Sequence, residues 1–334
     1  MDSFDFISIF KKKLNERNIN WYVKALVDSD NNLLTLGTDS KLIGRIFELK
    51  SMVLLQEIAK EHKGYELVKP EAQTIYPDYL YMCPDGSKIA VDIKTTYLDT
   101  AKGKNTISYT LGAYTSYLRN GTKNIEGSYD EYTHHYIVGF VYDRLSNEDG
   151  IILPNTQENL ASIPSPYGNV RVWVQEKYKI AGTSEGSGNT ANIGSISSKD
   201  LSDFENGNGP FSVLGEDIFE DYWRNFKYHS TTYKSIEDYI SWAKESSPIR
   251  EKKDYSLILD QYIQWRRIHS PTKEDYLLMA IKALRTKGKR GADKELSADL
   301  GKAGTISITK KKNEILEYVV FCENNAIPIE IIQL

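Results

Sequence analysis

The chain contains little cysteine and little histidine for its length. Its 334 residues include two cysteines, Cys83 and Cys322, and five histidines, at positions 62, 134, 135, 229 and 269. Two cysteines exclude a framework of several disulfides and a cysteine-rich metal site, and the histidines lack the spacing of a zinc motif. A catalytic metal in this chain would therefore have to be held by carboxylates.

Long apolar segments and internal repeats are also absent. No apolar run approaches the ~20 residues that cross a bilayer. The first residues, Met1-Asp2-Ser3-Phe4-Asp5, lack the basic region of a signal peptide. We therefore expect a cytoplasmic protein with reduced thiols and no membrane association. The absence of repeats excludes solenoid architectures.

Positive charge is scarce in most of the chain. The formal net charge is −4, from 42 Lys and Arg against 46 Asp and Glu. Residues 249–334 hold 16 basic against 12 acidic residues, net +4, which leaves 26 against 34, net −8, for residues 1–248. This balance argues against indiscriminate affinity for duplex DNA, but it leaves room for a concave basic cleft.

Hydrophobic periodicity predicts helices and strands without regular alternation. Helical patterns cover residues 4–18 and the stretch from a cap at Asp39 or Ser40 to His62, and residues 110–119 are compatible with a short helix. Residues 136–142 form a continuous apolar run and residues 170–175 alternate, as strands do. We predict an α/β or α+β body around one mixed β-sheet flanked by helices.

A β-hairpin is predicted over residues 76–96. Two β-rich runs, residues 79–82 and 89–91, are joined by the turn residues Pro84-Asp85-Gly86-Ser87. Asp92 and Lys94 then project from one face of the sheet, because they are two residues apart. Asp78 shares that face if residue 82 pairs with 88, whereas an even-length loop would place it on the other face. We predict the odd loop.

The residue types of this hairpin suit phosphodiester chemistry. Two carboxylates are hard ligands for Mg²⁺, which is often bound by one or two carboxylates together with waters and a substrate phosphate. A lysine beside them supplies a cation for developing charge or, if its pKa is lowered, a base for water. The motif also occurs on solvated hairpins without function, so spacing alone is not specific. By pattern alone, Glu48 is a solvated residue beside the apolar stripe of its helix.

A second stretch, residues 182–195, is rich in glycine and asparagine. It lacks the Gly-Lys-Ser/Thr of a nucleotide P-loop. It fits either a flexible surface loop or a backbone that approaches another molecule closely. Asparagine can bind adenine through two hydrogen bonds in the major groove, and glycine lets main-chain N–H groups reach base edges.

Taken together, these segments resemble the EcoRV family of type II restriction endonucleases, in the PD-(D/E)xK nuclease superfamily. The similar runs keep their order over about residues 1–244, which makes the resemblance far more specific than the catalytic motif. They are Ile46-Phe47-Glu48-Leu49, Tyr76-Pro77-Asp78, Asp92-Ile93-Lys94-Thr95-Thr96-Tyr97, Thr110-Leu111-Gly112, Tyr114-Thr115-Ser116, Arg119-Asn120, Thr122-Lys123-Asn124-Ile125, Gly186-Ser187-Gly188-Asn189-Thr190, Asn192-Ile193-Gly194-Ser195 and Asp221-Tyr222-Trp223-Arg224-Asn225.

The resemblance assigns roles to individual residues. It implies that Asp78 and Asp92 bind Mg²⁺, that Lys94 is the catalytic lysine, and that Glu48 is an accessory carboxylate of the same metal site. It also implies that residues 182–195 carry the loop that reads the major groove, with Gly186, Gly188, Asn189, Thr190 and Asn192 as DNA-binding positions. Gln73 matches a minor-groove position, and Thr115, Ser116, Lys123 and Arg144 match positions near the DNA backbone.

The resemblance further implies the substrate and partners. We expect a homodimer that makes a blunt cut in double-stranded DNA at the palindrome GATATC, with a cognate DNA methyltransferase as its functional partner. Ala72, Thr74 and Ala191 depart from the family pattern, which leaves the outer or flanking base pairs open. The alternatives are a structure-specific or repair nuclease of the same superfamily, and a DNA-binding regulator with an inactive nuclease body.

Residues 249–334 have no counterpart in the resemblance. Helical periodicity runs through residues 257–268 and 276–284, and residues 295–312 resemble a helix-turn-helix with a basic second helix. The other interpretation is a helical appendage that packs on the body or extends the dimer. We therefore predict an endonuclease domain over residues 1–248 and a small helical C-terminal extension over residues 249–334.

Overall fold

The fold was obtained as a computed structural model, which describes residues 4–145, 149–187, 191–228, 233–271, 275, 294–299, 305–311 and 314–321. The chain divides into two compact units, Met1–Ser235 and Ile236–Leu334. The division precedes helix α8, whereas the sequence predicted it after residue 248. No helix in the described part of the chain is both long and apolar enough to cross a membrane.

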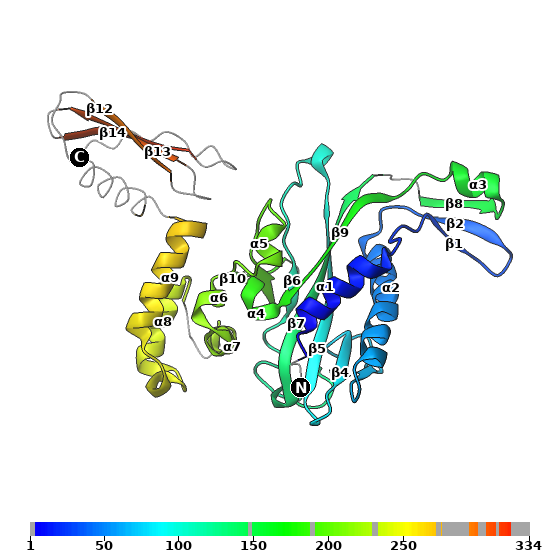
Figure 1. The fold of residues 1–334 in the computed structure, drawn as a ribbon, viewed down its shortest axis with the longest axis horizontal. Helices are drawn as coiled ribbons and strands as arrows, with labels where there is room; N and C mark the ends of the chain where they lie inside the picture. Colours follow the sequence, from blue (N-terminus) through cyan, green and yellow to red (C-terminus); the bar gives the residue numbers. More distant parts are fainter. Residues whose placement is uncertain are drawn as a thin grey trace. The chain divides into compact units, whose positions relative to one another are not determined.

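The first unit is built on a five-stranded mixed sheet in the order β3-β4-β5-β7-β9 (Figure 1). Strands β5 and β7 are parallel and the other neighbours are antiparallel, so the predicted mixed sheet flanked by helices is confirmed. The strands are β3 (Glu66–Val68), β4 (Tyr79–Met82), β5 (Lys88–Leu98), β7 (Tyr132–Arg144) and β9 (Tyr167–Glu176).

Helices α1 (Phe6–Arg17) and α2 (Ser40–Glu61) cover one face of this sheet (Figure 1). Asp39 caps α2, since its carboxylate accepts hydrogen bonds from the backbone N–H groups of Lys41 at 2.8 Å and Leu42 at 3.1 Å. Apolar residues at helical spacing, among them Ile43 and Phe47, then face the sheet. Both predicted helices are confirmed.

We expect Phe47→Ala to lower the free energy of unfolding by about 3–5 kcal/mol. The Phe47 ring is fully buried and stacks on Phe140, with 4.6 Å between ring centroids, so its removal leaves a cavity. Urea unfolding followed by circular dichroism measures the change. Val53 lies on the same helix but is 54% exposed, and Val53→Ala should change stability by no more than about 0.5 kcal/mol. Equal effects of the two substitutions would contradict this placement of the core.

Two smaller sheets complete the first unit. One has the order β1-β2-β8 and the other has the order β10-β11-β6. Among the short helices that follow in the chain, α4, α6 and α7 pack on one another. Their elements, with the short helices, are β1 (Ala25–Val27), β2 (Asn32–Leu36), η1 (Thr100–Lys102), β6 (Thr110–Ala113), η2 (Tyr129–Glu131), β8 (Asp149–Pro154), α3 (Gln157–Ser162), α4 (Lys177–Ile180), β10 (Ala181–Glu185), β11 (Asn192–Ser195), α5 (Ser202–Glu205), α6 (Phe211–Leu214) and α7 (Glu216–Asn225).

The expected short helix over residues 110–119 was wrong, since strand and turns take its place. Residues Thr110–Ala113 form strand β6, which pairs with β11. Gly112 has a φ of +101°, a left-handed backbone conformation that a right-handed helix excludes. Pairing with a distant strand therefore overrides a local sequence that is compatible with a helix.

The second unit contains helices α8 (Ile236–Ser246) and α9 (Tyr255–His269), the 3₁₀ turn η3 (Arg250–Lys252), and an antiparallel sheet of strands β12 (Lys294–Asp299), β13 (Thr305–Lys311) and β14 (Glu314–Phe321). The helix predicted over residues 257–268 is confirmed as part of α9, and the helix predicted over 276–284 lies outside the described residues.

The suggested helix-turn-helix is corrected by this sheet. Residues Thr305–Lys311 pair with both neighbouring strands instead of forming a helix. The alternation Thr305-Ile306-Ser307-Ile308-Thr309 explains the difference, because β-branched residues at every second or adjacent position favour an extended chain. The extension is therefore mixed in structure rather than wholly helical.

Candidate active site

The hairpin brings the two predicted carboxylates opposite each other. Strands β4 and β5 pair Met82 with Lys88 and Tyr79 with Val91, which is the register that the odd loop requires. The loop closes through a hydrogen bond from the N–H of Gly86 to the carbonyl of Cys83 at 2.9 Å, with Gly86 in the left-handed region. Asp78 therefore lies across from Asp92.

Asp78 is held in a largely buried position. Its Oδ2 accepts a hydrogen bond of 2.7 Å from the backbone N–H of Ile93, which fixes the carboxylate against strand β5. Burial, together with the neighbouring Asp92 carboxylate, raises the pKa of Asp78 well above its usual range. Ionising both carboxylates here is unfavourable, and a bound cation would offset that cost.

Lys94 is the cation beside this pair. Its Nζ lies 2.7 Å from Oδ2 of Asp92, and its side chain is 23% exposed. Burial alone would lower the pKa of Lys94, but the Asp92 and Asp78 carboxylates outweigh that effect and raise it. In this state Lys94 is an ammonium, which favours the stabilisation of developing negative charge over the alternative role as a base.

Glu48 lies on α2 and faces the same cavity, but its carboxylate forms an ion pair with Arg45, one turn earlier on the helix. In the described ranges, no three His, Cys, Asp or Glu side chains are gathered closely enough to hold a metal ion. In this structure Glu48 pairs with Arg45, and its role as a third metal ligand stays a prediction. The carboxylates of Asp78 and Asp92 form a two-ligand set that fits Mg²⁺ completed by waters and substrate.

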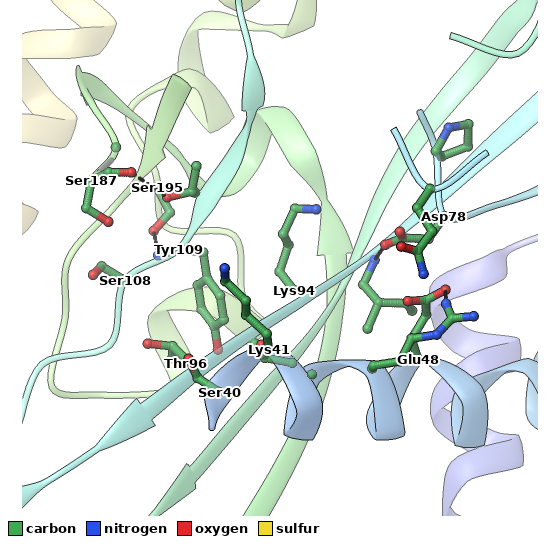
Figure 2. A pocket seen from close by; sticks show the side chains of 18 of the residues that line it. Ser40, Lys41, Glu48, Asp78, Lys94, Thr96, Ser108, Tyr109, Ser187 and Ser195 are labelled. Carbon is green, nitrogen blue, oxygen red and sulfur yellow. Dashed lines mark hydrogen bonds and ion pairs between the residues drawn. The ribbon is translucent and has the colours of Figure 1, made fainter. Parts of the chain in front are cut away.

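A cavity of about 1250 Å³ opens in front of these residues. Figure 2 shows Lys94 between Asp78 and Glu48 on one side and Ser187 and Ser195 on the other. Five cations line the cavity, and they are Lys41, Arg45, Lys69, Lys94 and Lys104. Four carboxylates, Glu48, Glu71, Asp78 and Glu185, line it as well. The lining is therefore mixed in charge, and its lysines and arginine can pair with the phosphate backbone of a nucleic acid.

The predicted recognition loop connects strands β10 and β11. The N–H of Gly186 donates a hydrogen bond of 2.9 Å to the carbonyl of Asn192, which closes the base of the loop. Strand β11 continues into close packing, since a Cβ on Gly194 would lie 2.5 Å from the carbonyl oxygen of Ser184. Gly186 and Ser187 line the cavity that contains Lys94. Gly188, Asn189 and Thr190 lie outside the described residues.

The remaining predicted DNA-binding residues are spread around the body. Gln73 is exposed and lines the cavity, and Lys123 is exposed outside it. Thr115 is half-buried. Ser116 is 5% exposed, and its hydroxyl donates to the carbonyl of Lys123 at 2.8 Å, so in this structure it stabilises a turn. Arg144 donates to the carbonyl of Thr38 at 3.1 Å.

Sequence reasoning missed several basic residues of the cavity wall. Lys41, Lys69 and Lys104 come from separate segments of the chain and converge only in the folded protein. Lys104 lies over the Tyr97 ring at 3.4 Å from its centroid, which orients its ammonium group. Nothing in the sequence distinguishes these lysines from solvated surface lysines.

Comparison with known proteins agrees with the geometry. A family model described as restriction endonuclease EcoRV matches residues 17–244. The type II restriction enzyme EcoRV of Escherichia coli is 40% identical over 235 residues, which cover 69% of this chain and 94% of that enzyme. The chain belongs to the EcoRV family of restriction endonucleases. It is thus a type II site-specific deoxyribonuclease with DNA as its substrate.

The range matched by the EcoRV family model includes the residues of both walls of the cavity. The matched range contains the Asp78 and Asp92 hairpin, Lys94 and the strands of the recognition loop. Enzymes of the EcoRV family generally depend on a divalent metal, which agrees with the carboxylate pair. The matched range ends within α8, before the sheet of strands β12 to β14.

Proposed function

We propose that the protein hydrolyses phosphodiester bonds of double-stranded DNA in a Mg²⁺-dependent reaction at a short palindrome. One observation carries this proposal. The Asp78 and Asp92 carboxylates and the Lys94 ammonium lie beside a cavity whose opposite wall is formed by the strands of the recognition loop. DNA bound there would place a phosphate at the catalytic residues and base edges at the loop.

The catalytic residues divide the chemistry between them. Asp78 and Asp92 would hold Mg²⁺, which when bound supplies Lewis-acid stabilisation and a more acidic water. Asp78 is kept in place by Ile93 N–H. Lys94 places a positive charge near the scissile phosphate, where negative charge grows as water attacks phosphorus and the 3′ oxygen leaves. Glu48 would serve as the accessory carboxylate once it is released from Arg45.

For specificity we propose GATATC, cut to blunt ends. The support is the ordered similarity of residues 186–195, with Gly186, Gly188, Asn189, Thr190 and Asn192 reading the major groove and Gln73 the minor groove. Thr115, Lys123 and Arg144 are proposed to contact the backbone, and Ser116 to act through the turn that it stabilises. Because Ala191 departs from the family pattern, the outer base pairs are the part of the recognition sequence where this enzyme could differ from GATATC.

The first test is digestion of plasmid DNA with the purified protein and Mg²⁺, followed by sequencing of the fragment ends. We expect discrete blunt ends within GATATC and no cutting when a chelator replaces Mg²⁺. Discrete ends at another palindrome would support the endonuclease activity but change the recognition sequence assigned to the loop. Ends at many unrelated sequences would favour a structure-specific or repair nuclease. Sequence-specific binding without any cutting would contradict the catalytic proposal and favour a regulator.

We also propose that the enzyme works as a homodimer, with one protomer for each half of the palindrome. The β1-β2-β8 sheet supports this, because its register places Leu26, Leu34 and Ile152 side by side in a row across three strands. Leu26 is 43% and Ile152 61% exposed. We name these three residues the apolar row. An exposed apolar row on a sheet suits a self-complementary contact between two copies.

Two features of the cellular setting belong to the same proposal. An enzyme that cuts a short palindrome would also cut the DNA of its own cell, so a cognate DNA methyltransferase is expected as a functional partner. A cytoplasmic location follows from a substrate of cellular or invading DNA.

A further inference from the structure

Lys177 is a lysine buried in the protein. It is 3% exposed and is the first residue of α4. Among the described residues no carboxylate forms an ion pair with it. Its Nζ donates a hydrogen bond of 2.5 Å to the hydroxyl of Tyr117. Burial lowers the pKa of Lys177 to about 7. A buried ammonium without a counterion is costly for stability, so its presence calls for an explanation.

The side chain of Lys177 touches the segment that carries Asp78. Its Nζ lies 4.9 Å from the ring centroid of Tyr76 and 5.0 Å from that of Tyr117, distances at which a cation is attracted to an aromatic face. The two rings stack on each other at 4.4 Å. Tyr76 stands two residues before Asp78, and its hydroxyl hydrogen-bonds Nδ1 of His135 at 2.9 Å. The position of the Tyr76 ring thus depends on Tyr117 and Lys177.

The main chain of Lys177 belongs to the recognition side of the cavity. Helix α4 runs directly into β10, the strand that enters the recognition loop. Strand β6 pairs with β11, the strand that follows the loop, and it passes close to the Lys177 ammonium group. A Cβ on Gly112 of β6 would lie 3.0 Å from the Tyr117 hydroxyl and 3.7 Å from Nζ of Lys177. Because the packing is this tight, a shift of either strand would move the Lys177 side chain or its partners.

We propose that Lys177, Tyr117 and Tyr76 form a relay that sets the position of Asp78 according to the position of the recognition strands. This inference rests on the proposed function, since it assigns Asp78 to the catalytic centre. The three residues are positioning residues, because none of them touches the substrate in the proposed reaction. The relay supplies the continuous packed connection that coupling between two sites requires.

The test compares Lys177→Met with Lys179→Met. Methionine keeps the length and volume of the lysine stem but removes the charge and the hydrogen bond. Lys179 lies in the same helical turn, but it is partly exposed and pairs with Glu176 at 2.5 Å, so it serves as the matched control. Three quantities are measured: the single-turnover rate on a duplex with the mapped site, its dependence on Mg²⁺ concentration, and the affinity for that duplex without metal.

We expect Lys177→Met to slow cleavage of the mapped site about tenfold or more, within the usual range of coupling between sites. The Mg²⁺ concentration for half the maximal rate should rise, because Asp78 is displaced. Cleavage of a duplex with one altered base pair should fall less, so discrimination decreases. Metal-free DNA affinity should stay within about threefold, and the melting temperature should stay equal or rise, since an unpaired buried charge is removed. Lys179→Met should match the wild type.

Unchanged rate, metal dependence and discrimination in Lys177→Met would overturn the relay. An equal loss of metal-free affinity and rate would also overturn it, because that pattern indicates a general structural role. If Lys177→Met does not fold, Tyr117→Phe decides, since it removes only the hydroxyl that Lys177 binds; the same direction of change supports the relay and wild-type behaviour overturns it. Absence of cleavage by the wild type would instead contradict the proposed function itself.

Discussion

Replacing Asp92 by alanine is expected to reduce the single-turnover rate of DNA cleavage on the order of 10⁴-fold. Asp92 is 4% exposed, lies across the hairpin from Asp78 and pairs with Lys94 at 2.7 Å. Its removal takes away a proposed metal ligand and the partner that orients the lysine. DNA binding should be no weaker than in the wild type, because one negative charge is removed from a surface that meets phosphates.

Rapid-quench cleavage assays and gel-shift titrations measure these two effects. Asp85→Ala is a matched control, because Asp85 is an aspartate of the same hairpin that only accepts hydrogen bonds from Ser87 in an exposed turn. It should keep nearly the wild-type rate. Lys94→Ala should behave like Asp92→Ala, with lost cleavage and retained binding. Substantial cleavage by either variant would exclude this carboxylate and lysine set from the chemistry.

Placing a charge in the apolar row is expected to separate the proposed homodimer and, with it, to reduce cleavage of the proposed palindrome at least about 100-fold. Ile152→Asp puts a carboxylate on the most exposed member of the row, in strand β8 beside Leu34 of β2. Burying an unpaired carboxylate in a contact between two protomers is strongly unfavourable. Each monomer would then hold only half of the site.

Sedimentation equilibrium over a range of concentrations reports the change in mass, and the plasmid assay reports the change in cutting. Ile151→Asp serves as the control, because Ile151 is the neighbouring residue and alternation along β8 points its side chain to the opposite face. A variant Ile152→Asp that stays dimeric and cuts normally would show that the apolar row is not the dimer contact. A wild-type protein that is monomeric when it cuts would contradict the dimer altogether.

Local signals predicted the catalytic hairpin well, because the physics that sets it is local. The Asp85 side chain accepts from Ser87, and Gly86 takes the left-handed conformation that a three-residue loop needs. The loop length then dictates the register, and the register puts Asp78 opposite Asp92. The helix cap at Asp39 was predictable for the same reason, since both partners of the cap lie within three residues.

Predictions failed where pairing with distant strands decides the outcome. Gly112 belongs to a strand because β11 is present beside it, and residues 305–311 form a strand because two other strands pair with them. The accessory role of Glu48 stays a prediction, because its carboxylate pairs with Arg45 in this structure. Each result depends on which groups become neighbours after folding.

The sequence by itself determined the fold class, the hairpin with its Asp78, Asp92 and Lys94, and the resemblance that led to the EcoRV family. Those features arise from periodicity, turn chemistry and ordered motifs that are short in sequence. The tertiary structure alone decided the convergence of lysines at the cavity, the apolar row across three strands and the burial of Lys177. They are properties of packing between segments far apart in the chain, and no local pattern specifies them, because a lysine or leucine has the same local preferences whether it ends in solvent or in a contact.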